Sequence, residues 1–448
     1  MLRPLIPVLS VQIRRQYATK IKKCVILQDK DKIPVDRYPL ASESARRVYV
    51  WGHAATGALG YQKSLKKQKL KHTQFVQHPS RLQFAEVQDV IDVACGYGFS
   101  AFAVKRSDDI SLFGCGINTD SQVGFHKFGG VTNRPMELMI YPAPIVLPKR
   151  TDDCKIQIKS VAAGRAHLLA LSEDGVVFTM GNNAYGQCGR PVVENEKYAA
   201  SQTVHQIEEL NGTKIAGITC GQDHSLFLLN NGTVYSCGWG ADGQTGLGHY
   251  KSVDVPTLIG GDISTEKIVK VAGTVDCVLM LNDKGEVFGF GNAEYGQLET
   301  VGDSQQVNEP KFVSLTKGLG KIVDIAAGGS FCMVLNENGN VFVWGYGILG
   351  LGPKVDYVKE PYRIPPTLFG RNEMSPDSRV TSISCGISHM AAINSDNDLY
   401  MWGRNKLGCL GLGHKDDQFF PLKIAVTAKV LKVSCGVDHT LALCKPFI

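Results

Sequence analysis

Residues 220–248 read CGQDHSLFLLNNGTVYSCGWGADGQTGLG, and this stretch decides the fold. It opens with a cysteine and a glycine, places a histidine three positions after that glycine, and continues with an apolar run. Asn231 and Gly232 separate this run from a second alternating run, which ends in a glycine-rich loop. An Asn-Gly pair between two such runs is the strongest short-range signal for a β-hairpin, because both turn residues need a positive φ. The stretch therefore predicts strand, tight turn, strand and loop, and it contains no catalytic motif.

The first half of this stretch recurs seven times, at intervals of about 50–68 residues. Periods in this range indicate a repeat architecture. In the sixth copy Asn397 takes the place of the hairpin glycine, and asparagine tolerates a positive φ better than most residues. The copies are VIDVACGYGF (90–99), IKSVAAGRAH (158–167), IAGITCGQDH (215–224), IVKVAGTVDC (268–277), IVDIAAGGSF (322–331), VTSISCGISH (380–389) and VLKVSCGVDH (430–439).

The second half also recurs, but one copy is displaced to the other end of the chain. Six copies follow their first halves, whereas the seventh stands near the N-terminus as YVWGHAATGALG (49–60). A ring whose last blade combines both ends of the chain leaves no exposed sheet edge. The offset therefore predicts an all-β fold, a seven-bladed β-propeller over residues 45–448, closed by pairing of N- and C-terminal segments in one blade.

Composition fits this interpretation and excludes several classes of protein. Glycine is abundant, with 48 residues in a chain of 448, and this points to many turns. No stretch reaches the about 18 apolar residues that a membrane-spanning helix needs, so we expect no transmembrane segment. The net charge of +6 permits an acidic partner without requiring one. The 13 cysteines contain no C-x-x-C pair, which argues against a zinc site or a disulfide framework.

The N-terminal region differs in character from the repeats. Residues 1–28 carry six basic residues and no acid, and apolar residues recur there at helical spacing. Such a segment is typical of a mitochondrial transit peptide, with a processing site after Tyr17. We therefore assign residues 1–40 to a transit peptide and N-terminal extension, and expect a location in the matrix or on the matrix face of the inner membrane. The alternative is a disordered basic arm, because Pro4 and Pro7 interrupt a helix.

Four histidines occupy one position of the repeat: His167, His224, His389 and His439. Each belongs to a different blade, so we expect them to be buried and neutral, and to form hydrogen bonds within their own blade rather than to bind a metal. Motifs for a nucleophilic serine, a phosphate-binding loop or a dinucleotide site are absent from the sequence. We therefore expect no catalytic residue, no metal and no cofactor.

The combined repeat, V/I-A-C-G-x-x-H-S-L followed by G-x-V-Y-x-W-G-x-N-x-x-G-Q-L-G, is similar to that of the regulator of chromosome condensation family. The resemblance covers about residues 45–448. The stretches GFHKF, CGQDHSLFL, YSCGWGADGQTGLGHY, FVWGYGILG and IPPTLFG look most like the mitochondrial branch of G-exchanging-factor-like proteins. The resemblance implies a guanine-nucleotide exchange factor, without covalent chemistry, for a mitochondrial GTPase of the dynamin-like fusion class. An alternative role in the family is a scaffold that binds mitochondrial ribosomal RNA and RNA-modifying proteins during large-subunit assembly. The first role would bring peripheral association with the inner membrane.

The resemblance also points to partner-contact residues. Exchange factors of this family direct acids that stand just before the repeat histidine toward their GTPase. The matching residues here are Asp223, Asp276 and Asp438, with Gln222 and Arg165 beside them. The alternative is that each aspartate only caps its own turn. Thr274 replaces the loop glycine of the fourth copy, so that loop should differ in shape.

Segments between the repeats are further candidates. A run of lysines within residues 61–81 could bind RNA or another anionic surface, or could simply be a solvated loop. Its members are Lys63, Lys66, Lys67, Lys69 and Lys71. Residues 125–157 and 353–379 are predicted to be long loops inserted between blades.

Overall fold

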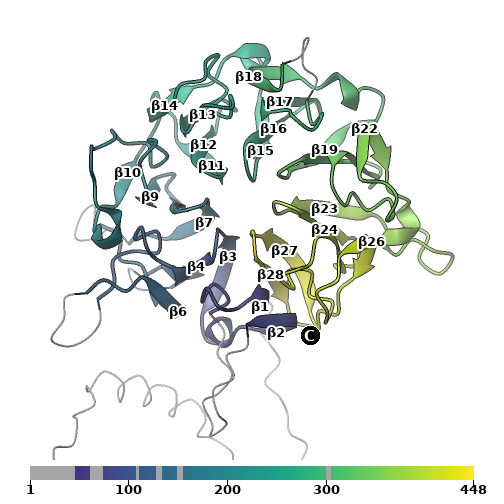
Figure 1. Ribbon diagram of the computed structural model, residues 1–448, viewed down its shortest axis with the longest axis horizontal. Helices are drawn as coiled ribbons and strands as arrows, with labels where there is room; N and C mark the ends of the chain where they lie inside the picture. Colours follow the sequence, from purple (N-terminus) through teal and green to yellow (C-terminus); the bar gives the residue numbers. More distant parts are fainter. Residues whose placement is uncertain are drawn as a thin grey trace, which may run out of the picture. The chain divides into compact units, whose positions relative to one another are not determined.

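The fold was analysed in a computed structural model, which describes residues 46–60, 74–106, 110–127, 134–148, 155–298 and 304–447. Seven four-stranded antiparallel sheets follow one another around a common centre (Figure 1). In each sheet the first strand of the blade lies nearest the centre and the fourth lies at the periphery. The predicted seven-bladed β-propeller is therefore confirmed.

Blades 1 to 3 come first in the chain. Blade 1 consists of β3 (Asp89–Cys95), β4 (Phe99–Lys105), β5 (Leu112–Ile117) and β6 (Leu138–Pro144). Blade 2 consists of β7 (Ile158–Ala163), β8 (His167–Ser172), β9 (Val177–Gly181) and β10 (His205–Ile207). Blade 3 consists of β11 (Ile215–Cys220), β12 (His224–Leu229), β13 (Val234–Gly238) and β14 (Val253–Leu258).

Blades 4 to 6 continue in the same order. Blade 4 consists of β15 (Ile268–Ala272), β16 (Cys277–Asn282), β17 (Val287–Asn292) and β18 (Gln306–Phe312). Blade 5 consists of β19 (Ile322–Ala327), β20 (Phe331–Asn336), β21 (Val341–Tyr346) and β22 (Tyr357–Arg363). Blade 6 consists of β23 (Val380–Cys385), β24 (His389–Asn394), β25 (Leu399–Gly403) and β26 (Gln418–Lys423).

Blade 7 combines the two ends of the described chain. Its strand order is β2 (Phe75–Arg81), β1 (Arg47–His53), β28 (His439–Lys445) and β27 (Lys429–Cys435). Strands β1 and β28 are antiparallel, with Tyr49 opposite Ala442 and Trp51 opposite Thr440. The predicted closure of the ring by both ends of the chain is therefore confirmed.

Helical structure in the described residues is limited to five short 3-10 turns, and none of these helices has the length and hydropathy needed to cross a bilayer. Their bounds are η1 (Gln83–Glu86), η2 (Tyr198–Ala200), η3 (Gly261–Ile263), η4 (Ser314–Thr316) and η5 (Pro366–Phe369).

The predicted hairpin forms, but its turn differs from the expected type, because Asn231 does not adopt a positive φ. Gly232 in the predicted hairpin has a φ of 89°, and Asn397 adopts a φ of 63° in the equivalent position of blade 6. The third strand of each blade has a glycine with positive φ as its last or last but one residue, as Gly238 with a φ of 113° ends β13. Gly238 lies opposite His224 at a β-bulge, where a Cβ atom would stand 2.5 Å from the carbonyl oxygen of Asp223. This close approach explains why the repeat requires glycine there.

Two segments predicted as inserted loops are in part strands. Residues 125–157 contain β6, and residues 353–379 contain β22 and η5, so each supplies the outermost strand of its blade. The loop prediction was wrong there because these strands are largely solvent-exposed. An exposed edge strand lacks the run of apolar, buried residues that identifies inner strands such as β12 and β13.

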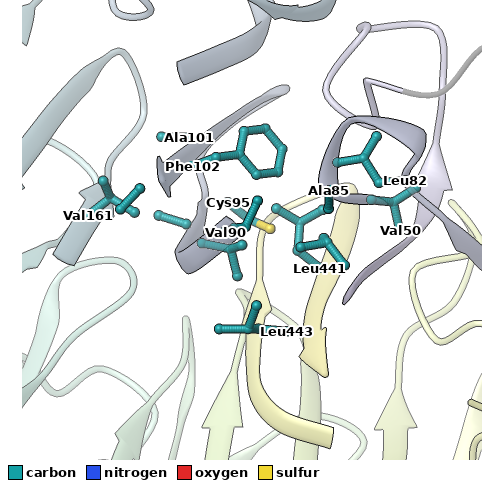
Figure 2. Packing of buried hydrophobic residues seen from close by; sticks show 14 of the residues in the cluster. Val50, Leu82, Ala85, Val90, Cys95, Ala101, Phe102, Val161, Leu441 and Leu443 are labelled. Carbon is teal, nitrogen blue, oxygen red and sulfur yellow. The ribbon is translucent and has the colours of Figure 1, made fainter. Parts of the chain in front are cut away.

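Apolar side chains from neighbouring sheets fill the space between the blades. Figure 2 shows Leu441 of blade 7 close to Cys95 of blade 1, and Val50 of blade 7 close to Leu82; these residues and Val161 of blade 2 belong to one buried cluster. Removal of this surface from water is the main favourable contribution to folding. Each sheet is thus held by packing on both of its neighbours.

A buried carboxylate on an innermost strand adds polar contacts between blades. Asp92 on β3 is 5% exposed and accepts hydrogen bonds from the backbone amides of Val93, at 2.9 Å, and of Val161 on β7, at 3.0 Å. It also forms an ion pair with Lys432 on β27. One side chain therefore joins blades 7, 1 and 2.

The same arrangement occurs a second time in the ring. Asp324 on β19 is 6% exposed and accepts from the amide of Ile383 at 3.0 Å and from the hydroxyl of Ser382 at 3.3 Å, both on β23. Its other oxygen accepts from the amide of Ile325 at 2.9 Å and pairs with Lys270 on β15. Asp324 therefore joins blades 4, 5 and 6.

Candidate functional site

Short loops between the first and second strands of the blades line one rim around the centre of the propeller. We call them the inner-rim loops; they comprise residues 96–98, 164–166, 221–223, 273–276, 328–330, 386–388 and 436–438. Backbone hydrogen bonds connect neighbouring loops. The amide of Arg165 donates to the carbonyl of Gln222 at 2.9 Å, and the amide of Gln222 donates to the carbonyl of Val275 at 3.3 Å. The loops of blades 2, 3 and 4 therefore lie side by side.

Arg165 and Asp223 form the central contact of this region. The guanidinium binds both carboxylate oxygens, at 3.1 Å from Nε and 2.7 Å from a terminal nitrogen. This two-point geometry fixes both side chains more firmly than a single contact would. Burial raises the pKa of Asp223, and the charge of Arg165 limits that rise. The Arg165 side chain is 45% exposed, so its outer surface remains accessible to a partner.

Gln222 and Tyr97 extend the site toward blade 1. The Tyr97 hydroxyl donates to the side-chain oxygen of Gln222 at 3.3 Å. Burial raises the pKa of Tyr97, and the nearby carboxylates of Asp276 and Asp223 raise it further. Tyr97 therefore remains a neutral hydrogen-bond donor that holds Gln222 in place.

Asp276 extends the site toward blade 4. Its carboxylate accepts from the side-chain amide of Gln244 at 3.1 Å. Burial and the neighbouring Asp242 raise the pKa of Asp276 to about 6. Two acids thus share a partly enclosed position, where an incoming positive charge would be stabilised. The loop of blade 4 has one residue more than the others, because β15 already ends at Ala272, and the predicted difference in shape is confirmed.

Asp438 has different surroundings. One oxygen contacts Nδ1 of His439 at 2.8 Å, and the other lies 3.5 Å from Nδ1 of His53. Burial raises the pKa of Asp438, but these histidines outweigh burial and the net shift is downward. Asp438 therefore contacts residues of its own blade, whereas Arg165, Gln222, Asp223 and Asp276 gather at blades 2 to 4.

The repeat histidines are buried as predicted, but three of them form hydrogen bonds to the following blade. Nε2 of His439 lies 2.8 Å from the hydroxyl of Ser100, and Nε2 of His167 lies 3.1 Å from that of Ser225. Both hydroxyls belong to the next blade, so the prediction of bonds within one blade was wrong for these Nε2 contacts, although Nδ1 of His439 does contact Asp438 of its own blade. The side chain starts the second strand and points across the gap between sheets. Burial lowers the pKa of His167 to about 4, which keeps this histidine neutral. Burial also lowers the pKa of His439, but its contacts with Cys95 and Asp438 outweigh burial and raise the pKa to about 10, so the prediction of a neutral histidine was wrong there.

Nothing in the described residues resembles a metal or redox centre. No group of three or more histidines, cysteines, aspartates or glutamates is placed to hold an ion. The 11 described cysteines are all buried and form no disulfide. Burial raises the pKa of Cys188 and of Cys385 to about 12, so these thiols stay protonated. They pack as small apolar residues.

Comparison with known proteins identifies the repeat. The regulator of chromosome condensation (RCC1) repeat matches residues 47–103, 174–228, 231–281, 284–335, 338–393 and 396–443, which together make up most of the chain. The chain belongs to the RCC1 repeat family.

Two relatives are similar over nearly their whole length. The RCC1-like G exchanging factor-like protein of mouse is 45% identical over 427 residues, covering 93% of this chain and 91% of the relative. A crystal structure of human WBSCR16 has a TM-score of 0.84 and 44% identity, covering 90% of this chain and 100% of that chain. A crystal structure of yeast RCC1 (Prp20) bound to Kap60 has a TM-score of 0.71 at 19% identity, over 94% and 96% of the two chains, and shows the same fold.

Within this RCC1 propeller, the sequence did not reveal three members of the rim site: Tyr97, Asp242 and Gln244. Gln244 belongs to the recurring Gly-Gln pair of the second half, where its oxygen accepts from the amide of Asp242 at 2.8 Å. Asp242 in turn accepts from the side-chain amide of Gln306 at 2.7 Å. Aligning the second halves with the inner-rim loops would have pointed to Asp242. The predicted transit peptide and the five lysines, Lys63, Lys66, Lys67, Lys69 and Lys71, lie outside the described residues.

Proposed function

We propose that this RCC1 propeller is a guanine-nucleotide exchange factor, and that its GTPase binds the inner-rim loops of blades 1 to 4. The observation that carries the proposal is 45% identity, over 93% of the chain, to a protein named RCC1-like G exchanging factor-like protein. The group of Tyr97, Arg165, Gln222, Asp223 and Asp276 supports it, because polar loops on a rigid scaffold are a common form of binding site.

Exchange requires no bond to be made or broken. A propeller that binds the nucleotide-free GTPase more tightly than the loaded form shifts the equilibrium toward nucleotide release. Arg165 and Asp223 would meet the partner already oriented, so little side-chain entropy is lost on binding. Asp276 and Asp242 would accept a lysine or arginine of the partner, which relieves their mutual repulsion.

We expect Asp223→Ala to reduce the acceleration of nucleotide release about 10- to 100-fold, as for a contact residue that contributes about 1–3 kcal/mol to binding. The measurement is release of a fluorescent guanine nucleotide from a candidate GTPase, at equal concentrations of folded propeller. Asp283→Ala is the matched control, because Asp283 is an exposed aspartate in the hairpin turn at the opposite end of β16.

Equal loss of acceleration in Asp223→Ala and Asp283→Ala would contradict the assignment of the site. No acceleration by the wild-type chain, together with its co-sedimentation with ribosomal precursors, would instead support the ribosomal RNA scaffold. Asp438→Ala is informative as a second comparison, since Asp438 occupies the same repeat position but contacts residues of blade 7.

The proposed place of action is the mitochondrion, with a dynamin-like fusion GTPase of the inner membrane as partner. The basic, acid-free composition of residues 1–28 supports import. We expect a fluorescent fusion of the full chain to accumulate in mitochondria and a fusion without residues 1–17 to remain in the cytosol. Mitochondrial accumulation of the shortened fusion would refute the transit peptide.

A further inference from the structure

The repeat histidines reveal a pairing rule at the junctions between blades. At three junctions a buried histidine contacts a hydroxyl that stands one position further along the repeat in the next blade. The contacts are His439 with Ser100 at 2.8 Å, His167 with Ser225 at 3.1 Å and His389 with Thr440 at 3.4 Å. We call these contacts histidine–hydroxyl pairs.

Each hydroxyl also donates back to the preceding blade. Ser225 donates to the carbonyl of Gln187 at 2.6 Å, and Thr440 donates to the carbonyl of Cys409 at 2.8 Å. Because the single hydroxyl hydrogen is used in this way, the histidine donates to the hydroxyl through Nε2. Every histidine–hydroxyl pair thus provides two buried hydrogen bonds across one junction.

The junctions without a paired histidine have matched residues of another kind. Between blades 1 and 2, the histidine position holds Phe99 and the hydroxyl position holds Leu168. Between blades 5 and 6, the same two positions hold Phe331 and Met390, so both members of each pair are apolar. Between blades 4 and 5 the two positions hold Cys277 and Cys332, whose sulfur atoms lie 3.8 Å apart. At six junctions, therefore, polar residues meet polar residues, thiol meets thiol, or apolar residues meet apolar residues.

The junction between blade 3 and blade 4 breaks this rule. His224 is fully buried, but the position of the expected hydroxyl holds Val278, which is also fully buried. Neither Nδ1 nor Nε2 of His224 has a hydrogen-bond partner among the described residues. A buried polar group without a partner destabilises the closed arrangement relative to one in which water reaches it. The junction lacks both hydrogen bonds of a histidine–hydroxyl pair.

The remaining contacts at this junction are apolar packing and hydrogen bonds that do not involve His224. The hydroxyl of Thr219 donates to the carbonyl of Val271 at 3.2 Å, the amide of Ile268 donates to the carbonyl of Gly232 at 3.0 Å, and the side-chain amide of Gln244 donates to Asp276 at 3.1 Å. Leu226 of blade 3 packs in one buried cluster with Val278, Met280 and Phe290 of blade 4, which holds the sheets together. The amide of Gln222 donates across the junction at 3.3 Å, compared with 2.9 Å for the amide of Arg165 at the paired junction between blades 2 and 3. These contacts keep the junction closed, but none of them satisfies the ring nitrogens of His224.

We propose that the junction between blades 3 and 4 is a built-in point of local opening in the propeller. It lies directly beneath the loops that carry Asp223 and Asp276. When it opens, the loop of residues 221–223 and the loop of residues 273–276 move apart, and His224 gains access to water. If these loops bind a GTPase, as proposed above, the opening lets their spacing adjust to the partner. Buried polar groups without partners are expected where a fold sacrifices stability for function.

Either of two substitutions should repair the mismatch. Val278→Thr supplies the missing hydroxyl, with Nε2 of His224 and the carbonyl of Gln244 as partners; Thr440 is the natural precedent. His224→Phe makes the junction apolar, as Phe99 and Phe331 do. Phenylalanine fits this position, because Phe99 and Phe331 pack under Gly96 and Gly328 as His224 packs under Gly221. The double variant, His224→Phe with Val278→Thr, places a threonine hydroxyl opposite an apolar ring and so creates a new mismatch.

The test is amide hydrogen exchange of the full-length chain at neutral pH, read by mass spectrometry with residue-level fragmentation. The amide of Gln222 reports on the junction between blades 3 and 4, and the amide of Arg165 reports on the paired junction between blades 2 and 3. In the wild type, we expect Gln222 to exchange about tenfold faster than Arg165, the effect of about one net hydrogen bond. Each single repair should slow exchange at Gln222 about tenfold and leave Arg165 unchanged, and the double variant should return toward the wild-type rate.

Ser225→Val is the matched control, because it creates the same mismatch for His167. It should speed exchange at Arg165 about tenfold. Equal exchange at Gln222 and Arg165 in the wild type would overturn the proposal. So would unchanged exchange at Gln222 in both repaired variants, if their melting temperatures show that they fold. These readouts involve no GTPase, so failure of the exchange-factor proposal leaves them intact. Where acceleration of nucleotide release is measurable, we expect both repairs to reduce it.

Discussion

Replacing Asp324 by alanine is expected to lower the free energy of unfolding by about 3–5 kcal/mol, the usual cost of removing one partner from a buried, hydrogen-bonded ion pair. The substitution leaves the amides of Ile383 and Ile325 without their acceptor and Lys270 without its counter-charge. Because Asp324 connects three blades, the loss is not confined to one sheet. Chemical denaturation followed by tryptophan fluorescence measures the effect.

Two comparisons make this expectation specific. Asp92→Ala should lower the free energy of unfolding by a similar amount, since Asp92 has equivalent partners, two backbone amides and a lysine, in blades 7, 1 and 2. Lys270→Ala should cost less, because the Lys270 side chain is 41% exposed and the Asp324 carboxylate keeps its backbone donors. A loss below 1 kcal/mol for Asp324→Ala would show that the carboxylate does not hold the blades together.

Gly238→Ala is expected to destabilise the propeller by about 2–6 kcal/mol. The backbone at Gly238 has a φ of 113°, which costs a residue with a Cβ atom about 1–3 kcal/mol. The new methyl group would also stand 2.5 Å from the carbonyl oxygen of Asp223 and 2.6 Å from Cα of His224, an overlap that costs about 1–3 kcal/mol. Both contacts involve backbone atoms that cannot move aside without displacing the rim loop.

Gly217→Ala in the same blade is the control. Its nearest neighbour would be Cβ of Leu228 at 3.6 Å, an ordinary contact. Alanine there should leave stability within about 1 kcal/mol of the wild type, since it mainly restricts the unfolded chain. Thermal unfolding of both variants, followed by circular dichroism, distinguishes the two cases. Equal stability of the two variants would mean that the bulge relaxes more readily than its geometry indicates.

The inner three strands of each blade were predictable from sequence, and the outer strand was not. Inner strands such as β12 and β13 are buried, and a glycine that needs positive φ separates them. Outer strands such as β22 are mostly exposed and join the sheet through backbone hydrogen bonds, which leave little trace in residue type. The periodicity of side chains therefore revealed the hairpins but not the edges of the blades.

The candidate site was predictable only in part, for a related reason. The repeat position identified Asp223, Asp276 and Asp438 as equivalent, yet the structure gives them different neighbours. Asp223 pairs with Arg165 of the preceding blade, whereas Asp438 contacts His439 beside it. Contacts between blades join residues that are distant in sequence, and the sequence of one repeat does not indicate which residues of the adjacent blades it contacts. The mismatch of His224 with Val278 is likewise visible only once the order of the blades is known.

Closure of blade 7 by β1 and β28 also governs when folding can finish. A chain that emerges from a ribosome or a membrane pore in the order of its sequence presents β1 first and β28 last. Until β28 is free, β1 has no inner neighbour, and blades 1 to 6 form an open arc with an unprotected sheet face at each end. Such long-range pairing is slow and exposes apolar surface to aggregation. The nascent propeller therefore leaves β1 and one face of blade 6 uncovered until the last strand arrives.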